Sequence, residues 1–145
     1  GVSVWRTETG EVLHQQKQPA LWTTFSPDGR WLVLGRGRYE VWRTSDWSRV
    51  HTLDMRSIDP VQARAVFTPD GRSLATAHAF GRIGLWSVTD WKRYALIESP
   101  NSQPVGRFCF TPDQTRLYIA SSSGIVETWD LRRLEDELKK IGQGW

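Results

Sequence analysis

Apolar and polar residues alternate along this chain in a pattern that recurs three times. The middle copy has an apolar run ending at Phe67, a turn at Thr68-Pro69-Asp70-Gly71, and a second apolar run. A third run then ends at Trp86. Proline sets φ at the second turn position and glycine accepts positive φ, so this sequence favours a tight turn. The pattern predicts short strands on both sides of the turn and a third strand after them.

The copies recur with a regular period. Tryptophans end the third-strand runs at Trp5, Trp42, Trp86 and Trp129, which are 37, 44 and 43 residues apart. The turn prolines Pro27, Pro69 and Pro112 are 42 and 43 residues apart. Repeats of about 40–45 residues that hold four strands each are typical of the blades of a β-propeller.

The repeats resemble those of the WD-repeat family of β-propellers. The resemblance rests on the Phe-Ser/Thr-Pro-Asp motif, on the third strand that ends in Trp, and on Trp129-Asp130, the dipeptide that names the family. It covers nearly the whole chain and implies an all-β fold with blades of four antiparallel strands. The segment from Trp129 to Trp145 also resembles the ends of WD-repeat regions in large bacterial proteins, many of which carry a kinase domain upstream.

The strand inventory amounts to about three and a quarter blades. We expect thirteen strands, distributed over a partial blade 1–16, a blade 20–54, a blade 62–98 and a three-stranded blade 105–129. Closed propellers have about 4–8 blades, and an open arc exposes sheet faces and edges. We therefore expect residues 1–129 to be the C-terminal part of a larger propeller, whose other blades lie upstream or on another chain.

The period becomes helical from Asp130 onward, in the tail 130–145. Apolar residues recur at three- and four-residue spacing and form one stripe: Leu131, Leu134, Leu138 and Ile141. Asp130 is the expected N-cap and Gly142 the expected C-terminal glycine. Glu135 with Lys139, and Asp136 with Lys140, are predicted i,i+4 pairs. The apolar face of the predicted helix packs against the rim or the bottom of the propeller; the alternative is a helix that binds a partner.

One departure from the family concerns hydrogen bonding. In well-formed WD repeats a Gly-His pair, a loop Asp, a strand-two Ser or Thr and the strand-three Trp form a buried network. Here no Gly-His pair precedes an inner strand, and Phe80 and Ser123 stand where the resemblance places the loop Asp. A buried network that lacks members is unfavourable. We therefore expect Trp42, Trp86 and Trp129 to pack as apolar side chains.

Composition adds few candidates for chemistry. The 19 Lys and Arg residues exceed the 16 Asp and Glu residues only slightly, and they are scattered, so a nucleic-acid partner is not favoured. The single cysteine, Cys109, forms no intrachain disulfide and is expected to be a buried small apolar residue. His14, His51 and His78 lack the spacing of a metal site. We predict no enzyme activity, no cofactor, no membrane span and a cytoplasmic location.

Two surfaces are candidates for binding. The loops that join strand two to three and strand four to one share one end of a propeller, and there the repeats place Arg36, Arg38, Arg56, His78 and Phe80. Arginine binds carboxylate and phosphate groups in a bidentate manner. The alternative is an ordinary solvated surface.

The opposite end carries the turns and two Asp-Trp pairs that recur 44 residues apart. Trp47 and Trp91 form a docking platform if their indoles are exposed; the alternative is that each packs over its own blade.

Taken together, these features favour a non-enzymatic scaffold for protein–protein interaction, whose partners are other proteins or upstream domains of the same polypeptide. One alternative is a module that binds acidic or phosphorylated ligands, or nucleic acid, through the arginine-bearing loops. Another is a sensory or regulatory region of a larger signalling protein such as a kinase. Fold alone does not decide among these functions.

Overall fold

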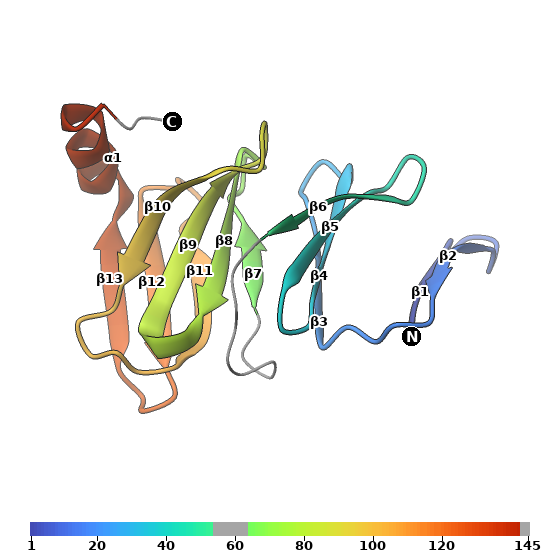
Figure 1. Cartoon of the computed structure of the whole chain (residues 1–145), viewed down its shortest axis with the longest axis horizontal. Helices are drawn as coiled ribbons and strands as arrows, with labels where there is room; N and C mark the ends of the chain where they lie inside the picture. Colours follow the sequence, from blue (N-terminus) through green and yellow to red (C-terminus); the bar gives the residue numbers. More distant parts are fainter. Residues whose placement is uncertain (54–63, 143–145) are drawn as a thin grey trace.

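A computed structural model describes residues 1–53 and 64–142 of the chain. These residues form thirteen strands and a C-terminal helix, as the repeat pattern predicts, and the fold is mostly β (Figure 1). Each of four antiparallel sheets joins strands in sequence order. Sheet 1 contains β1 (Val2–Trp5) and β2 (Val12–Gln16). Sheet 2 contains β3 (Trp22–Phe25), β4 (Trp31–Gly35), β5 (Tyr39–Arg43) and β6 (Ser48–Leu53).

Sheet 3 has the same four-stranded order, with a short 3-10 turn between its second and third strands. It contains β7 (Ala65–Phe67), β8 (Ser73–His78), η2 (Ala79–Gly81), β9 (Arg82–Ser87) and β10 (Arg93–Glu98). Sheet 4 contains β11 (Val105–Phe110), β12 (Arg116–Ser121) and β13 (Val126–Asp130), and α1 (Leu131–Lys140) follows it.

The register is the same in the three larger sheets. In sheet 3 Phe67 lies opposite Leu74, which lies opposite Trp86. Sheets 2 and 4 repeat this row of aromatic, leucine and tryptophan residues as Phe25, Leu32, Trp42 and as Phe110, Leu117, Trp129. Residues directly opposite one another lie on the same face of a sheet, so each row presents one apolar stripe to a neighbouring sheet.

A side-chain hydrogen bond closes each predicted turn. The hydroxyls of Ser26, Thr68 and Thr111 donate to the carboxylates of the Asp two residues later, at 2.6, 2.7 and 2.5 Å. The same hydroxyls accept the backbone N–H at the start of the next strand. Gly29 and Gly71 adopt φ of +71°, the conformation expected of the glycine in these Pro-Asp-Gly turns.

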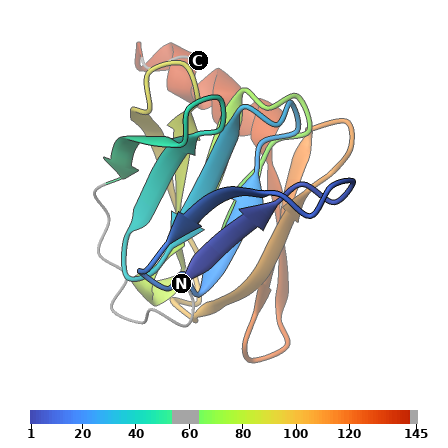
Figure 2. The same cartoon turned by 90° about the vertical axis from the view of Figure 1, so that its right-hand side faces the viewer.

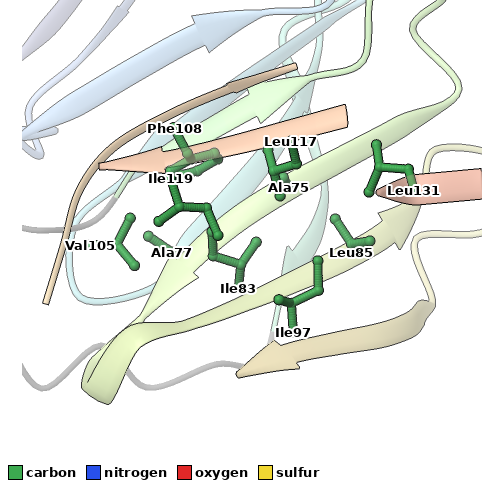
Figure 3. Packing of buried hydrophobic residues seen from close by; sticks show 10 residues of the cluster. All are labelled: Ala75, Ala77, Ile83, Leu85, Ile97, Val105, Phe108, Leu117, Ile119 and Leu131. Carbon is green, nitrogen blue, oxygen red and sulfur yellow. The ribbon is translucent and has the colours of Figure 1, made fainter. Parts of the chain in front are cut away.

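Two apolar cores hold the sheets face to face. The first lies between sheets 2 and 3 and includes Val41 and Leu53 from one side and Leu74 and Trp86 from the other. The second lies between sheet 3, sheet 4 and α1 (Figure 3). Its buried members are Ala75, Ala77, Ile83, Leu85, Ile97, Val105, Phe108, Leu117, Ile119 and Leu131. Sheets 2, 3 and 4 are therefore packed face to face in succession, as expected of neighbouring blades.

Tyr39 adds a polar link between sheets 2 and 3. Its side chain is fully buried, and its hydroxyl lies 2.7 Å from the carbonyl oxygen of Ala77 and 2.9 Å from that of Arg64. Burial raises the pKa of the Tyr39 phenol, so the group remains a hydrogen-bond donor at physiological pH. The link fixes the loop ends of the two sheets relative to each other.

Helix α1 packs on the second core through Leu131 and Leu134, so the predicted packing of its apolar face against the strands is confirmed. The Asp130 carboxylate accepts the Arg133 N–H at 3.1 Å, which confirms the predicted N-cap. The Glu135–Lys139 ion pair forms at 2.7 Å.

Two details of the predicted helix are wrong. Lys140 pairs with Glu137 at 3.3 Å rather than with Asp136. Ile141 is 69% exposed because the helix has ended and Gly142 turns the chain with φ of +72°.

The sheet faces at the two ends of the stack are open. Cys109 is exposed, so its predicted burial is wrong. It lies opposite Tyr118, on the face of sheet 4 that points away from the second core, whereas its neighbour Phe108 points into that core. At the other end Leu21 is 57% and Phe25 48% exposed, on the side of sheet 2 where sheet 1 provides only two strands.

Candidate functional site

Five connections in the described part of the chain gather at one end of the stack, and we call this end the loop face. They are 17–21, 36–38, 79–81, 99–104 and 122–125, which join strand two to three or strand four to one. Figures 1 and 2 both place them at the lower edge of the drawing, opposite α1. The two inter-sheet cores hold these connections in a fixed arrangement, because each connection ends on a strand that packs in or beside a core.

Arg36 and Arg38 occupy the β4–β5 turn on the loop face. The Arg36 N–H donates to the Arg38 carbonyl at 3.0 Å across Gly37, whose φ is +68°. Arg38 forms an ion pair at 3.3 Å with Glu40, whose carboxylate also accepts from Arg49 at 3.2 Å. Glu40 is only 8% exposed, so this buried carboxylate positions the two guanidinium groups. Within residues 1–53 and 64–142, no ion pair engages Arg36.

A cleft of about 340 Å³ lies beside this turn. Sheets 1 and 2 both contribute to its lining: Gln16, Gln18, Pro19, Ala20, Leu34, Gly35, Arg36, Arg38 and Glu40. Its charged groups are two arginines and one glutamate, which already has two cationic partners. The cleft can therefore accept a carboxylate or phosphate group of a ligand.

His78 lies at the end of β8 but is not displayed on the loop face. It is 6% exposed, and its Nε2 lies 2.8 Å from the Thr76 hydroxyl. The Trp86 Nε1 donates to the same hydroxyl at 2.7 Å. Burial, and secondarily the charge of Arg93, lowers the pKa of His78 to about 3, so its imidazole is neutral at physiological pH.

This arrangement overturns one expectation. Trp86 was expected to pack as an apolar side chain, but its indole N–H belongs to a buried hydrogen-bonded network with Thr76 and His78. The sequence contains the signal: Thr76 and His78 alternate on one strand and face the strand that carries Trp86. The WD-repeat resemblance places the histidine of such a network in a Gly-His pair ahead of the inner strand, whereas here the histidine lies at the end of the second strand.

Phe80 is the most prominent apolar side chain of the loop face. It is 63% exposed and adopts φ of 61° and ψ of 38° in η2, between the buried residues His78 and Gly81. The fifth candidate of this face, Arg56, lies outside the described residues.

Trp47 and Trp91 lie at the opposite end, and both pack on the preceding sheet rather than over their own. Trp91 is 7% exposed, and its ring meets Trp31 of sheet 2 edge to face at 5.3 Å between centroids. Trp47 is half-buried and stacks on His14 of sheet 1 at 5.1 Å. Both have positive φ, 55° and 56°. These indoles contribute to inter-sheet packing, and Trp91 presents no exposed ring.

A second cleft, of about 480 Å³, lies between sheet 3 and α1 at that end. Acidic and basic side chains alternate around it, Asp70 and Glu135 with Arg72 and Arg132. Its charges balance, so the cleft has no preference for the sign of a ligand's charge.

The described residues contain no group of three or more His, Cys, Asp or Glu side chains arranged to hold a metal ion. No helix in the described part of the chain is long and apolar enough to cross a membrane.

Comparison with known proteins gives distant relatives. No family model matches the chain. The chain is 28% identical over 142 residues to the meiotic recombination protein rec14 of Schizosaccharomyces pombe, which covers 90% of this chain and 44% of the relative. It is 27% identical over 124 residues to the periodic tryptophan protein 2 of Saccharomyces cerevisiae, covering 75% of this chain and 13% of the relative. The chain thus spans less than half the length of these curated relatives. Its distant homologues are WD-repeat proteins.

Proposed function

We propose that this chain is part of a WD-repeat scaffold that holds other proteins, and that its loop face is the surface that contacts them. The observation that carries the proposal is the packing of sheets 2, 3 and 4 through two continuous cores and the Tyr39 link. Such packing holds loops from separate repeats in one arrangement, and a preorganised surface loses little entropy on binding. The distant WD-repeat relatives support the same role.

The proposal is tested by comparing the two ends of the stack in the full-length protein. Arg36→Gln with Arg38→Gln alters the loop face, and Arg72→Gln is the matched control on the opposite end, where Arg72 has an 88% exposed side chain. Quantitative affinity purification from the source cells should show proteins that depend on the loop face and are retained by the control. The proposal fails if both variants retain the same proteins as the unmodified chain.

A second function is favoured by the cleft beside Arg36 and Arg38: binding of an acidic or phosphorylated segment of a partner protein. Arg36 has no ion-pair partner among the described residues, and Glu40 holds Arg38 in place. A glutamate-rich peptide and a phosphoserine peptide, each with a neutral counterpart, are the probes in fluorescence titrations. Affinity should fall with added salt and with Arg36→Gln. Equal binding of a single-stranded oligonucleotide would indicate a nucleic-acid site instead.

We also propose that further blades, on this polypeptide or on another chain, cover the open faces of sheets 2 and 4. Exposed Leu21 and Phe25 at one end and exposed Cys109 at the other support this proposal. The test is the rate at which a maleimide reagent labels Cys109. Labelling should be fast in residues 1–145 alone and at least about tenfold slower in the complete assembly, because a neighbouring blade would bury the thiol. Equal rates would contradict the proposal.

A further inference from the structure

We infer that Phe80 is a rigidly held aromatic anchor that inserts into an apolar pocket of a partner protein. The inference rests on the proposed scaffold function and identifies the contact residue and the chemistry of its partner. It arises from three features of η2: the exposure of the ring, the strain of the backbone beneath it, and the close packing that maintains the strain.

The backbone at Phe80 is in the left-handed region, which bulky residues rarely adopt. Asparagine or glycine would adopt this conformation at lower free energy. A strained residue persists only where the surrounding structure determines it, and such residues concentrate at functional positions. At Phe80 the strained backbone presents a ring that is 63% exposed, so burial of the ring among the described residues does not explain the conformation.

The surrounding packing is tight. A Cβ atom at Gly81 would lie 2.8 Å from the Gln103 carbonyl oxygen and 2.9 Å from Ser99 Cβ, so the backbone of η2 lies directly against the 99–103 segment. The Ser99 N–H donates to the Gly81 carbonyl at 2.9 Å. On the other side His78 is held by the Thr76 hydroxyl. The turn that carries Phe80 is therefore fixed at both ends.

The 99–104 segment is itself braced against sheet 4. The Ser99 hydroxyl donates to the Glu127 carboxylate at 2.5 Å, and the Asn101 side-chain amide donates to it at 3.2 Å. The Ser122 N–H donates to the Pro104 carbonyl at 3.2 Å, which brings the β12–β13 loop alongside. The three connections 79–81, 99–104 and 122–125 thus form one continuous strip, which we call the anchor strip.

The polar groups of the anchor strip define its partner. Exposed amides and hydroxyls dominate it: Asn101, Ser102, Gln103, Ser122 and Ser123. The neighbouring Arg82 is paired with Glu98 at 3.0 Å, and Glu127 already accepts three hydrogen bonds. A neutral rim around an exposed aromatic ring suits a protein surface that offers one apolar pocket and hydrogen-bonding groups around it. Among its described residues the anchor strip contains no Lys or Arg to bind a phosphate or nucleic acid, in contrast to the β4–β5 turn with Arg36 and Arg38.

Unfolding measurements test the strain without any partner. Position 80 is compared as Phe80→Gly and Phe80→Ala, and the matched control is Leu96→Gly and Leu96→Ala on an exposed position of β10, 38% exposed. Glycine ordinarily destabilises a strand relative to alanine. At position 80 we expect the reverse, with the glycine variant melting about 3 °C higher than the alanine variant. The strain argument is overturned if alanine is the more stable variant at both positions.

Photocrosslinking tests the anchor in the full-length protein. The photoreactive probe p-benzoylphenylalanine replaces Phe80 in one sample and Ile141, 69% exposed at the opposite end, in the other. We expect an adduct with one defined protein from position 80 only. That protein is then purified, and Phe80→Ala and Phe80→Gly should weaken its binding at least about tenfold while Phe80→Trp retains it.

Each remaining outcome contradicts the inference. An adduct between two copies of this chain would identify self-association instead, and unchanged affinity in Phe80→Ala would show that the crosslinked protein does not use the ring. If partners depend on Arg36 and Arg38 but not on Phe80, the scaffold proposal stands and the anchor fails. If neither set of variants alters any partner, the proposed function of the loop face fails as well.

Discussion

Sheets 2 and 3 have the same register but different interiors. Trp42 in one and Trp86 in the other each lie opposite a leucine. Two positions further along the second strand, sheet 2 has Leu34 where sheet 3 has Thr76. Consequently the Trp86 N–H donates to a buried hydroxyl, whereas the Trp42 N–H has no hydrogen-bond partner among the described residues.

The next alternate position shows the difference on the surface. Sheet 3 ends its second strand in His78, which is buried beside Thr76, and the equivalent position in sheet 2 is Arg36, which is exposed on the loop face. The same repeat position therefore holds a structural residue in one blade and a candidate binding residue in the next. The larger sheets share the apolar row of aromatic, leucine and tryptophan side chains, whereas the polar positions beside it differ from sheet to sheet.

The largest expected effect comes from removing the hydroxyl that only sheet 3 has. Thr76→Val should destabilise the chain by about 3 kcal/mol, because the buried Trp86 N–H and His78 Nε2 both lose their partner. Urea unfolding measures the change. The equivalent substitution in sheet 2, Leu34→Val, removes no hydrogen bond and should cost only about 1 kcal/mol. Equal losses in the two variants would mean that the network contributes nothing.

The second effect is the pH dependence of stability that His78 introduces. Burial lowers its pKa to about 3 from an ordinary value of 6.5, so the unfolded chain binds a proton that the folded chain excludes. The folded chain therefore has its full stability above pH 6.5. It loses stability as the pH falls from 6.5 toward 3, because protonation of His78 favours the unfolded chain. Stability should decrease by about 2 kcal/mol between pH 6.5 and pH 5.

Unfolding free energies measured across this pH range check the prediction. His78→Gln should flatten the dependence, and His51→Gln, at an exposed histidine in sheet 2, is the matched control. If the unmodified chain has the same stability at pH 6.5 and pH 5, then His78 titrates normally and the buried network is wrong.

The third effect concerns a polar group that sheet 2 has and sheet 3 lacks. Tyr39, three residues before Trp42, provides the buried hydroxyl that joins sheets 2 and 3. The equivalent residue in sheet 3, three residues before Trp86, is the apolar Ile83. Tyr39→Phe keeps the ring and should cost about 1.5 kcal/mol, since the Ala77 and Arg64 carbonyls lose a donor. Thermal unfolding reports the loss, and Ile83→Val provides a control of purely apolar packing. If Tyr39→Phe leaves the stability of the chain unchanged, water replaces the hydroxyl.

These contrasts explain which features could be predicted from sequence. The turn sequence and the alternation of apolar and polar positions predict the strands, because both depend on residues that are neighbours along the chain, and the period of the tryptophans shows how the strands group into repeats. The packing of Trp91 on Trp31 could not be predicted in this way, since it joins residues of different sheets. The same holds for Cys109, whose exposure depends on which face of sheet 4 meets the second core.

The candidate site was less predictable than the strands. Arg36, Arg38 and Phe80 lie on the end of the stack that the order of strands implies. The burial of His78 depends on its partner Thr76 in the same strand, and the positive φ of Phe80 depends on the fit of Gly81 against the 99–103 segment. Both require knowledge of which segments are in contact, and that information does not lie in the repeat period.

The smallest expected effect distinguishes the turns of the two sheets. The Ser26 hydroxyl and then the Arg30 N–H, together with the Arg30 guanidinium at 2.7 Å, lower the pKa of Asp28 to about 2. In sheet 3 the equivalent Arg72 lies 3.9 Å from Asp70.

Because the folded pKa of Asp28 is below the ordinary 3.8, its contribution to the stability of the chain is present above that pH and is lost as the pH falls through 2. Asp28→Asn should cost less than about 1 kcal/mol at pH 7, since solvent screens the exposed carboxylate. Urea unfolding should find a larger cost at pH 7 than at pH 2.5, where part of the contribution has been lost, and an equal cost at both would show that the amide disrupts the turn by its shape rather than by its charge.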